Sequence, residues 1–218
     1  MFIPYLGFFR KISQADVFVV YDTAQYSRGD WHNRNRILTS SGVEWLTIPV
    51  EAKLHDTFIT AKVSSTFQPR KQLEKIRQAY EKAPYFKEYF PAIEELYNKQ
   101  ASSLGEYNWN FISYILDVLD IKPRIVFAST LDMPNVHSTD ALIFLTRSVG
   151  CDAYISGEGG TNYIEPQKFT ENNIKLLMND FVVLPYTQQS KTAFEPYLST
   201  LDALMNVGAA GIRILIGL

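Results

Sequence analysis

The sequence has one cysteine and only three histidines among its 218 residues. A single cysteine, Cys151, excludes an intrachain disulfide, so the chain is not a small secreted domain held together by disulfides. Cys151 directly precedes an apolar stretch, and we expect it to serve packing rather than nucleophilic catalysis. The histidines, His32, His55 and His137, stand at unrelated spacings and give no metal-ligand pattern. We therefore expect no metal site.

The sequence also lacks a long apolar run and a strong charge of either sign. No stretch is long enough to cross a bilayer, and residues 1–9 are apolar but too short for a secretory signal. The expectation is a cytoplasmic protein that does not enter a membrane. The formal net charge of -2 gives no positive field that would attract nucleic acid.

Aromatic residues, in contrast, are abundant. They make up 14% of the chain, with 13 Tyr and 14 Phe. Such a surplus fills a core, lines a ring-binding cleft, or does both. The 46% of hydrophobic and 20% of charged residues are ordinary for a globular protein.

Short apolar runs alternate with helical patterns along the chain. Strands are predicted at 15–22, 44–50, 124–129, 153–156 and near 180–184. Helices are predicted at 6–14, over much of 69–120, and at 138–149, 166–173 and 199–208. Within 69–120, Pro84 ends one helix and Pro91 is placed to begin the next. This alternation favours an α/β fold with a mostly parallel sheet. We expect a single domain of residues 1–218 with a helical insertion or cap at about 69–120.

Polar side chains concentrate between Asp22 and Arg36, where the first predicted strand ends. Ligands of open α/β sheets bind at the carboxyl ends of strands, so this position favours a site. In an extended backbone, Arg34 and Arg36 face one side, where two guanidinium groups suit a phosphate or a carboxylate. The alternative is a solvated loop in which these arginines pair with Asp22 or Asp30.

A glycine-rich turn, from Ser156 to Gly160, directly follows a predicted strand. Gly157 and Gly159 let the backbone approach a ligand and present N–H groups to it. The spacing is not that of the dinucleotide-binding fingerprint. Glu158 is the carboxylate placed here to act as a base or to orient an amine. A turn selected only for its geometry is the alternative.

His137 is the histidine best placed for proton transfer. It precedes Ser138, Thr139 and Asp140, which are expected to cap a helix. Because a helix N-terminus also favours anions, these three residues serve either as a cap alone or as part of a binding site. His32 competes for the proton-transfer role, since it lies within the arginine cluster.

Several motifs, spread nearly from end to end, point to one protein family. They are the stretches 4–9, 15–19, 25–26, 33–37, 45–50, 138–140, 152–157 and 198–206. In these stretches the chain resembles the WbqC-like family, and Asn-Arg-Asn-Arg at 33–36 is quite specific. The resemblance implies a role in bacterial O-antigen and polysaccharide biosynthesis, beside enzymes that make amino sugars. It implies no established reaction and no catalytic residue.

The resemblance also implies a strand that this sequence does not contain. Family members carry a strand ending in Gln-Pro before the residues that match Met1–Pro4. Without it, two neighbouring strand edges are expected to be exposed and the sheet to be less stable. An N-terminally extended version is then expected to be more stable and to bind ligand better.

The first half is similar, more faintly, to nucleotidyltransferases and pantothenate synthetases. In these proteins a glycine-containing turn, a short helix and an Ala-Asp strand follow one another. The similarity implies a Rossmann-like, three-layer α/β fold. Those enzymes place two histidines in the turn, where this chain offers Tyr5 and Phe8, so their reaction is not carried over.

The leading functional hypothesis is a transferase that places an acyl or aminoacyl group on the amine of a nucleotide-linked amino sugar. The donor would be an acyl-CoA or an aminoacyl donor. Arg34 and Arg36 would grip the diphosphate or an activated carboxylate, and His137 or Glu158 would take the amine proton. The sugar would be oriented and stacked by Gln25, Tyr26, Trp31, Asn33 and Asn35.

Two rival hypotheses remain open. The first is an enzyme that activates a carboxylate with ATP. The second is a protein that binds a sugar nucleotide without turning it over, which would lose little on substitution of His137 and Glu158. The apolar tail 211–218 is expected to pack either on a second subunit, forming a homodimer, or on its own core.

Overall fold

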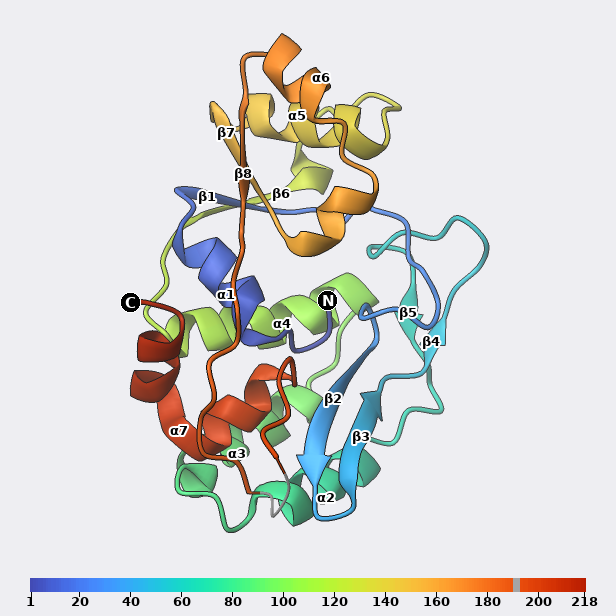
Figure 1. The fold of residues 1–218 in the computed structure, drawn as a ribbon. Coiled ribbons are helices and arrows are strands. Elements are labelled where there is room, and N and C mark those ends of the chain that lie inside the picture. The colour runs from blue at the N-terminus through green and yellow to red at the C-terminus, as the bar shows by residue number, and fades with distance from the viewer. Residues whose placement is uncertain (190–192) are drawn as a thin grey trace. The chain divides into compact units, whose positions relative to one another are not determined.

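A computed structural model describes residues 1–189 and 193–218, and the side chains of Glu158 and Thr161 lie outside the described part. The chain divides into two compact units. The first unit comprises Met1–Leu6, Ala24–Asp120 and Val183–Leu218, and the second comprises Gly7–Thr23 and Ile121–Val182. Figure 1 shows the elements of both units under their labels. The single domain expected from the sequence stays a prediction.

Four helices form most of the regular secondary structure among the described residues of the first unit. In chain order they are α2 (Pro69–Tyr80), α3 (Phe86–Asn98), α4 (Leu104–Val118) and α7 (Thr200–Leu215). Each buries one apolar face, as α2 does with Leu73, Ile76 and Tyr80. The helical pattern predicted over 69–120 is thus confirmed. In the part of the chain that the structure describes, no helix is both long and apolar enough to cross a membrane.

Aromatic rings fill the centre of the first unit. The ring centroid of Phe111 lies 5.6 Å from that of Phe2, 5.2 Å from that of Tyr97 and 5.5 Å from that of Tyr107. All four side chains are buried. Part of the aromatic surplus therefore serves the core, where edge-on ring contacts add to the burial of apolar surface.

The first unit also contains a β-hairpin formed by β2 (Arg34–Thr39) and β3 (Gly42–Thr47). A connection of two residues joins the strands, and Gly42 takes a positive φ of 108° directly after it. Two short strands, β4 (Val50–Glu51) and β5 (Lys62–Val63), form a second antiparallel pair.

The arginines belong to this hairpin and not to the polar segment expected directly after the first strand. Asn35 and Ile37 of β2 are buried, whereas Arg34 and Arg36 alternate with them and are only half-buried. The shared face predicted for the two arginines is confirmed. They do not belong to a loop after the first strand, however, because Ile37 and its neighbours pair with β3 as a strand of their own.

The second unit is built around two pairs of parallel strands. One pair joins β1 (Val17–Val20) to β6 (Arg124–Phe127), and the other joins β7 (Ala153–Ser156) to β8 (Lys175–Met178). The helices associated with these strands are α1 (Leu6–Ser13), α5 (Ser138–Ser148) and α6 (Pro166–Glu171). A core of Leu142, Ile143, Phe169 and Ile174 packs beneath the second pair.

The prediction of one mostly parallel sheet differs from the structure. The described residues form four two-stranded sheets, of which two are parallel and two antiparallel. Among these residues β1 pairs only with β6, and β7 only with β8, so each has an open edge. Both β1 and β7 line one cavity of about 440 Å³, which separates them. The α/β class is confirmed, and the Rossmann-like three-layer arrangement stays a prediction.

The strand predicted near 180–184 is also wrong, because the structure shows no strand at these residues. The strand β8 ends at Met178, where its register places it against β7. Val182 and Leu184 are 66% and 56% exposed. The apolar residues at these positions match a strand pattern, but they pair with no strand among the described residues.

Proline and glycine positions explain two further features of the helices. Pro91 lies inside α3 rather than at its start, because the buried face of that helix already begins at Phe86. Packing of this face outweighs the hydrogen bond that proline cannot donate. The predicted end at Gly208 is confirmed for the first helical segment of α7, because Gly208 has a φ of 66° and breaks the helix; a second segment continues to Leu215. A Cβ added to Gly208 would lie 2.7 Å from a ring carbon of Tyr85.

Candidate ligand-binding site

Two arginines and two tryptophans form an exposed surface on the first unit, which we call the Arg–Trp surface. The guanidinium carbon of Arg34 lies 4.3 Å from the centroid of the Trp45 ring, and that of Arg36 lies 5.7 Å from the Trp31 ring. The two indole rings are 5.3 Å apart. Each tryptophan remains 39% exposed. The surface therefore presents cationic groups and ring faces together.

The register of the hairpin explains this arrangement. Arg36 stands opposite Trp45 in the ladder, and Arg34 is two residues away on the same face of β2. Arg34 can therefore reach the Trp45 ring along the diagonal between strands. Strand pairing thus brings Arg34, Arg36 and Trp45 together, and Trp31 joins them from the turn before β2.

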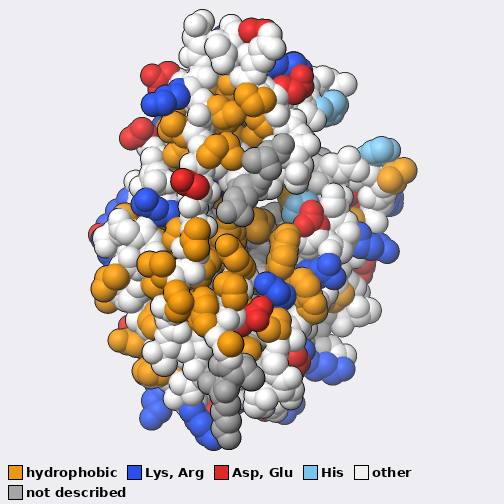
Figure 2. All heavy atoms as spheres, viewed as in Figure 1, with side chains coloured by type: hydrophobic (Ala, Val, Ile, Leu, Met, Phe, Trp, Pro, Cys, Tyr) orange, Lys and Arg blue, Asp and Glu red, His pale blue; other side chains and the backbone are white. Residues whose placement is uncertain are grey.

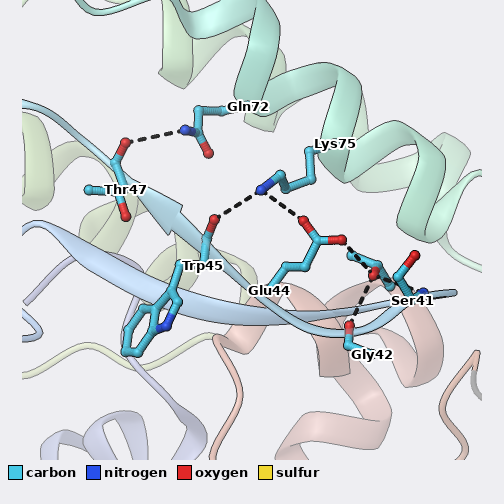
Figure 3. A network of polar contacts seen from close by, with 8 residues as sticks. Ser41, Gly42, Glu44, Trp45, Thr47, Gln72 and Lys75 are labelled. Atoms are coloured by element: carbon cyan, nitrogen blue, oxygen red, sulfur yellow. Dashed lines mark hydrogen bonds and ion pairs between the residues drawn. The ribbon is translucent and has the colours of Figure 1, made fainter.

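Helix α2 holds the backbone of β3 beneath Trp45. The Lys75 ammonium donates to the carbonyl oxygen of Trp45 at 3.2 Å and pairs with Glu44 at 2.9 Å. The Gln72 amide donates to the carbonyl of Thr47 at 3.2 Å. Figure 3 shows this network, with the Trp45 ring pointing away from Lys75. The hydrogen bond from Lys75 lowers the pKa of the Glu44 carboxyl. These contacts hold in place the strand from which the Trp45 ring projects.

The two arginines differ in their partners. Arg36 lies 3.6 Å from the Glu195 carboxylate and donates to the carbonyl of Tyr197 at 3.5 Å. The Nε atoms of Arg34 and Arg36 are both buried, and neither has a hydrogen-bond partner within the described chain. Each guanidinium therefore keeps hydrogen-bonding capacity that the described chain does not use. Neither arginine pairs with Asp22 or Asp30 among the ion pairs of the described residues.

The two asparagines of the cluster are used inside the unit. The Asn35 amide donates to the carbonyl oxygens of Phe2 at 3.2 Å and Ile3 at 2.7 Å. The Asn33 amide donates to the carbonyl of Ile48 at 2.7 Å. Both side chains are buried. These bonds give the amides a structural role, and a ligand contact for them stays a prediction.

The other candidates of the first unit lie in different environments. Gln25 is exposed and forms an isolated bridge with Thr57. Tyr26 packs in a small core with Ala61, and burial raises the pKa of its phenol. The ring of Tyr5 lies 5.8 Å from that of Tyr197, whose carbonyl accepts from an arginine of the Arg–Trp surface. Tyr5 is therefore near this surface, whereas Tyr26 belongs to the core.

His32 is half-buried and lies two residues before β2. Its Nδ1 accepts from the Ser27 N–H at 3.2 Å, and its ring lies 4.7 Å from that of Phe58. Burial lowers the pKa of the imidazole, although Asp30 lies 3.9 Å from Nε2 and opposes this shift. The neutral tautomer with its proton on Nε2 fits these contacts.

Asp22 belongs to the second unit, at the carboxyl end of β1. Its two oxygens accept from the Ser129 N–H at 2.9 Å and from the Ser129 hydroxyl at 2.6 Å. Ser129 follows β6, so this contact joins the carboxyl ends of two paired parallel strands. The position fits the sequence-based expectation for a ligand site, and a ligand contact for Asp22 stays a prediction.

The expected Ser/Thr/Asp cap of α5 is wrong. His137 occupies the cap position, is exposed, and makes no capping bond with its side chain. Ser138 begins the helix, and the buried Thr139 hydroxyl is turned instead toward the Glu165 N–H, from which it accepts at 3.0 Å. Asp140 accepts from Lys168 at 3.0 Å. The proton-transfer role of His137 stays a prediction.

The glycine turn forms a short 3₁₀ helix, Glu158–Asn162, and the side chain of Glu158 lies outside the described residues. Ser156 is buried and donates to the carbonyl of Gly157 at 3.0 Å. A Cβ on Gly160 would lie 2.0 Å from the Ser156 hydroxyl, so packing requires glycine there. At Gly157 and Gly159 it would meet nothing within 4 Å. Steric crowding therefore does not explain these two glycines.

The sequence did not indicate one residue of the Arg–Trp surface, Trp45, nor the ion-pair partner of Arg36, Glu195. Trp45 was assigned to a strand but not to a site, although strand pairing with the arginine block would have indicated it. Glu195 gave no signal in the sequence, because its contact with Arg36 joins segments far apart in the chain.

Exposed hydrophobic side chains are not confined to the Arg–Trp surface. Figure 2 shows them gathered on the visible face, with Lys and Arg among them.

Within the described residues, no three His, Cys, Asp or Glu side chains come together in a way that could hold a metal ion. The fold and the site define a mixed α/β protein with an arginine–tryptophan surface suited to an anionic ligand that carries a ring. The model of the WbqC-like protein family matches residues 1–214. The chain therefore belongs to the WbqC-like protein family.

The chain is also similar to a protein of Mycobacterium tuberculosis, "Uncharacterized protein Rv1507c". The two are 30% identical over 211 residues, which covers 95% of this chain and 91% of that protein. No solved structure matches the chain.

Proposed function

We propose that this protein is a transferase that places an acyl or aminoacyl group on the amine of a nucleotide-linked amino sugar used for a surface polysaccharide. The observation that carries the proposal is the Arg–Trp surface, where two guanidinium groups on one strand face lie beside two exposed indole rings. A nucleotide sugar combines an anionic diphosphate with a base and a sugar ring. Its charge suits the arginines and its rings suit the tryptophans.

The two arginines have different tasks in this proposal. Glu195 already neutralises part of the charge of Arg36, so a ligand must share that guanidinium or displace the carboxylate. Arg34 lies over the Trp45 ring and has no ion pair among the described residues. We therefore assign the principal diphosphate contact to Arg34 and a supporting contact to Arg36.

The acyl chemistry is supported by the amino-sugar context that the family resemblance implies, and the contacts above support only the binding step. The sugar amine attacks the carbonyl carbon of an acyl thioester or an aminoacyl ester. A C–N bond forms, the C–S or C–O bond breaks, and the thiol or alcohol leaves with a proton. The proton that the amine loses goes to a general base, for which His137 and Glu158 are the proposed groups.

The test uses the purified protein with a UDP-linked amino sugar and either acetyl-CoA or an aminoacyl ester as donor. Mass spectrometry should detect the acylated sugar nucleotide. His137→Gln or Glu158→Gln should abolish product while leaving the affinity for the sugar nucleotide unchanged, because proton transfer affects the chemical step. Binding without any product, with either donor, would overturn the transferase and leave a sugar-nucleotide-binding protein.

A further inference from the structure

The first turn of α7 buries a carboxylate. Asp202 has no exposed surface, and it accepts hydrogen bonds from the Tyr80 hydroxyl at 2.9 Å, the Tyr186 hydroxyl at 2.7 Å and the Gln188 amide at 2.9 Å. No cation forms an ion pair with it in the described part of the chain. Burial raises the pKa of Asp202, and the three donors oppose that shift. A buried carboxylate is costly unless such donors surround it.

One of these donors connects Asp202 to the strand that carries the arginines. The Tyr80 hydroxyl, which donates to Asp202, also accepts from the backbone N–H of Leu38 at 3.3 Å. Leu38 is two residues beyond Arg36 on β2. The Ser199 N–H, just before α7, donates to the carbonyl of Arg36 at 2.9 Å. The elements α2, α7 and β2 contact one another, as Figure 1 shows.

A second donor connects Asp202 to the partners of the Arg36 side chain. The Gln188 amide nitrogen also donates to the carbonyl of Glu195 at 2.9 Å, and its amide oxygen accepts from the Glu195 N–H at 2.9 Å. The Glu195 carboxylate in turn pairs with Arg36, which also donates to the carbonyl of Tyr197. One carboxylate thus holds both the backbone of Arg36 and the segment that contacts its guanidinium.

We propose that Asp202 is a positioning residue that sets the place of Arg36 in the Arg–Trp surface, through Tyr80 on one side and Gln188 on the other. The inference rests on the proposed function insofar as Arg36 contacts the ligand. Arg34, on the same strand face, has no such route to α7 among the hydrogen bonds of the described residues. The reading that competes with this one is a buried polar cluster that serves stability alone.

The chain offers a variant pair that separates the two readings. Gln188→Met breaks the route to Glu195 while leaving Asp202 its two tyrosine donors. Tyr186→Phe removes a hydrogen bond of similar length to the same carboxylate. The ring of Tyr186 packs on Phe194 rather than on an arginine. Asp202→Asn would leave three donors facing one acceptor oxygen and would test stability as well, so it is the secondary variant.

The first readout is the affinity for uridine diphosphate, measured by calorimetry. Gln188→Met should weaken binding roughly tenfold in the wild-type background and less than about twofold in an Arg36→Gln background, since coupled residues are not additive. Tyr186→Phe should change the affinity less than about twofold. An equal loss from both variants, or a loss that persists without Arg36, would overturn the proposal.

The second readout does not need a ligand. The Nε–Hε signal of Arg36 in a ¹⁵N NMR spectrum should shift in Gln188→Met and stay in place in Tyr186→Phe, while the Arg34 signal stays in place in both. An unmoved Arg36 signal in Gln188→Met would overturn the positioning role. If uridine diphosphate fails to bind the wild-type protein, the proposed function fails, and the Arg36 signal in Gln188→Met and in Asp202→Asn still decides the positioning role; an unmoved signal in Asp202→Asn would overturn the role of Asp202.

Discussion

Arg34 and Trp45 lie on adjacent strands of one hairpin, with the guanidinium carbon 4.3 Å from the centroid of the indole ring. Such a contact restrains the cation while its N–H edges remain free to donate. The first unit contains a matched pair for comparison: Arg77 lies 4.7 Å from the ring of Phe90, but it also pairs with Glu94 at 3.6 Å. Of these two arginines, Arg34 is therefore the one that a ligand anion can reach without competing with a carboxylate.

Replacing Trp45 by leucine should weaken ligand binding more than it weakens the fold. A ligand ring that stacks on the exposed indole contributes about 0.5–1.5 kcal/mol, and its loss corresponds to a loss of affinity of about two- to tenfold. Trp45 is 39% exposed, so the free energy of unfolding should change little. Calorimetric titration with uridine diphosphate and urea unfolding give the two values. Unchanged affinity in Trp45→Leu would remove the ring from the site.

Gly208→Ala should destabilise the protein. The backbone at Gly208 has a φ of 66°, and a Cβ would lie 2.7 Å from the Tyr85 ring, so the variant suffers both strain and a clash. We expect a loss of about 1–3 kcal/mol in the free energy of unfolding. Gly29→Ala is the control, because Gly29 has a φ of 79° but no atom within 4 Å of an added Cβ. Equal losses in the two variants would show that the Tyr85 contact is unimportant.

Stability should fall on mild acidification because of His32. Burial places its folded pKa below the ordinary 6.5 of the unfolded chain, so the folded state prefers neutral imidazole. The stability contributed by this preference is present above the unfolded pKa and is lost as the pH falls through 6.5 toward the folded pKa. Protonation also removes the Nδ1 acceptor of the Ser27 N–H.

Urea unfolding at several pH values between about 7.5 and 5.5 measures this dependence. His32→Gln keeps an acceptor for the Ser27 N–H without an ionisable group, and its stability should vary less over the same interval. The same slope in both proteins would assign the pH dependence to other groups.

Hydrogen exchange should reveal the open edges of β1 and β7. In a parallel strand, successive N–H groups point alternately to the two neighbouring strands, and each of these strands has only one neighbour in the described chain. About half of the amides in Val17–Val20 and Ala153–Ser156 should therefore exchange as fast as loop amides, since they face the cavity. Uniform protection along either strand would mean that its second edge is covered in solution.

The sequence predicted those parts of the fold that depend on local patterns. The apolar runs of β1 and β7 predicted strands, although most of their side chains are only half-buried. The predicted cap of α7 is confirmed, because the Ser199 hydroxyl accepts from the Leu201 N–H at 3.3 Å. The sequence pattern does not indicate the hairpin strand β2, because its buried position 35 is an asparagine. Its alternation of buried and exposed residues does not appear as alternating hydrophobicity.

The candidate site was predictable only in part for the same reason. Spacing alone placed Arg34 and Arg36 on one face, because the side-chain period of a strand is fixed. The contacts with Glu195 and the hydrogen bonds of Asp202 join distant segments, which no local pattern in a single sequence indicates. The sequence did not indicate the burial of Asn33 and Asn35, because amides that alternate with arginines resemble a ligand-facing cluster.

The most direct test of the account is a calorimetric titration of uridine diphosphate into the wild-type protein, Arg34→Gln and Arg77→Gln. We predict that Arg34→Gln weakens binding at least about tenfold, as expected for lost hydrogen bonds from a charged donor. Arg77→Gln should remain within about twofold of the wild type, because it removes only an exposed ion pair and a ring contact. Equal affinity for Arg34→Gln and the wild type, or an equal loss in both variants, would contradict the Arg–Trp surface as the ligand site.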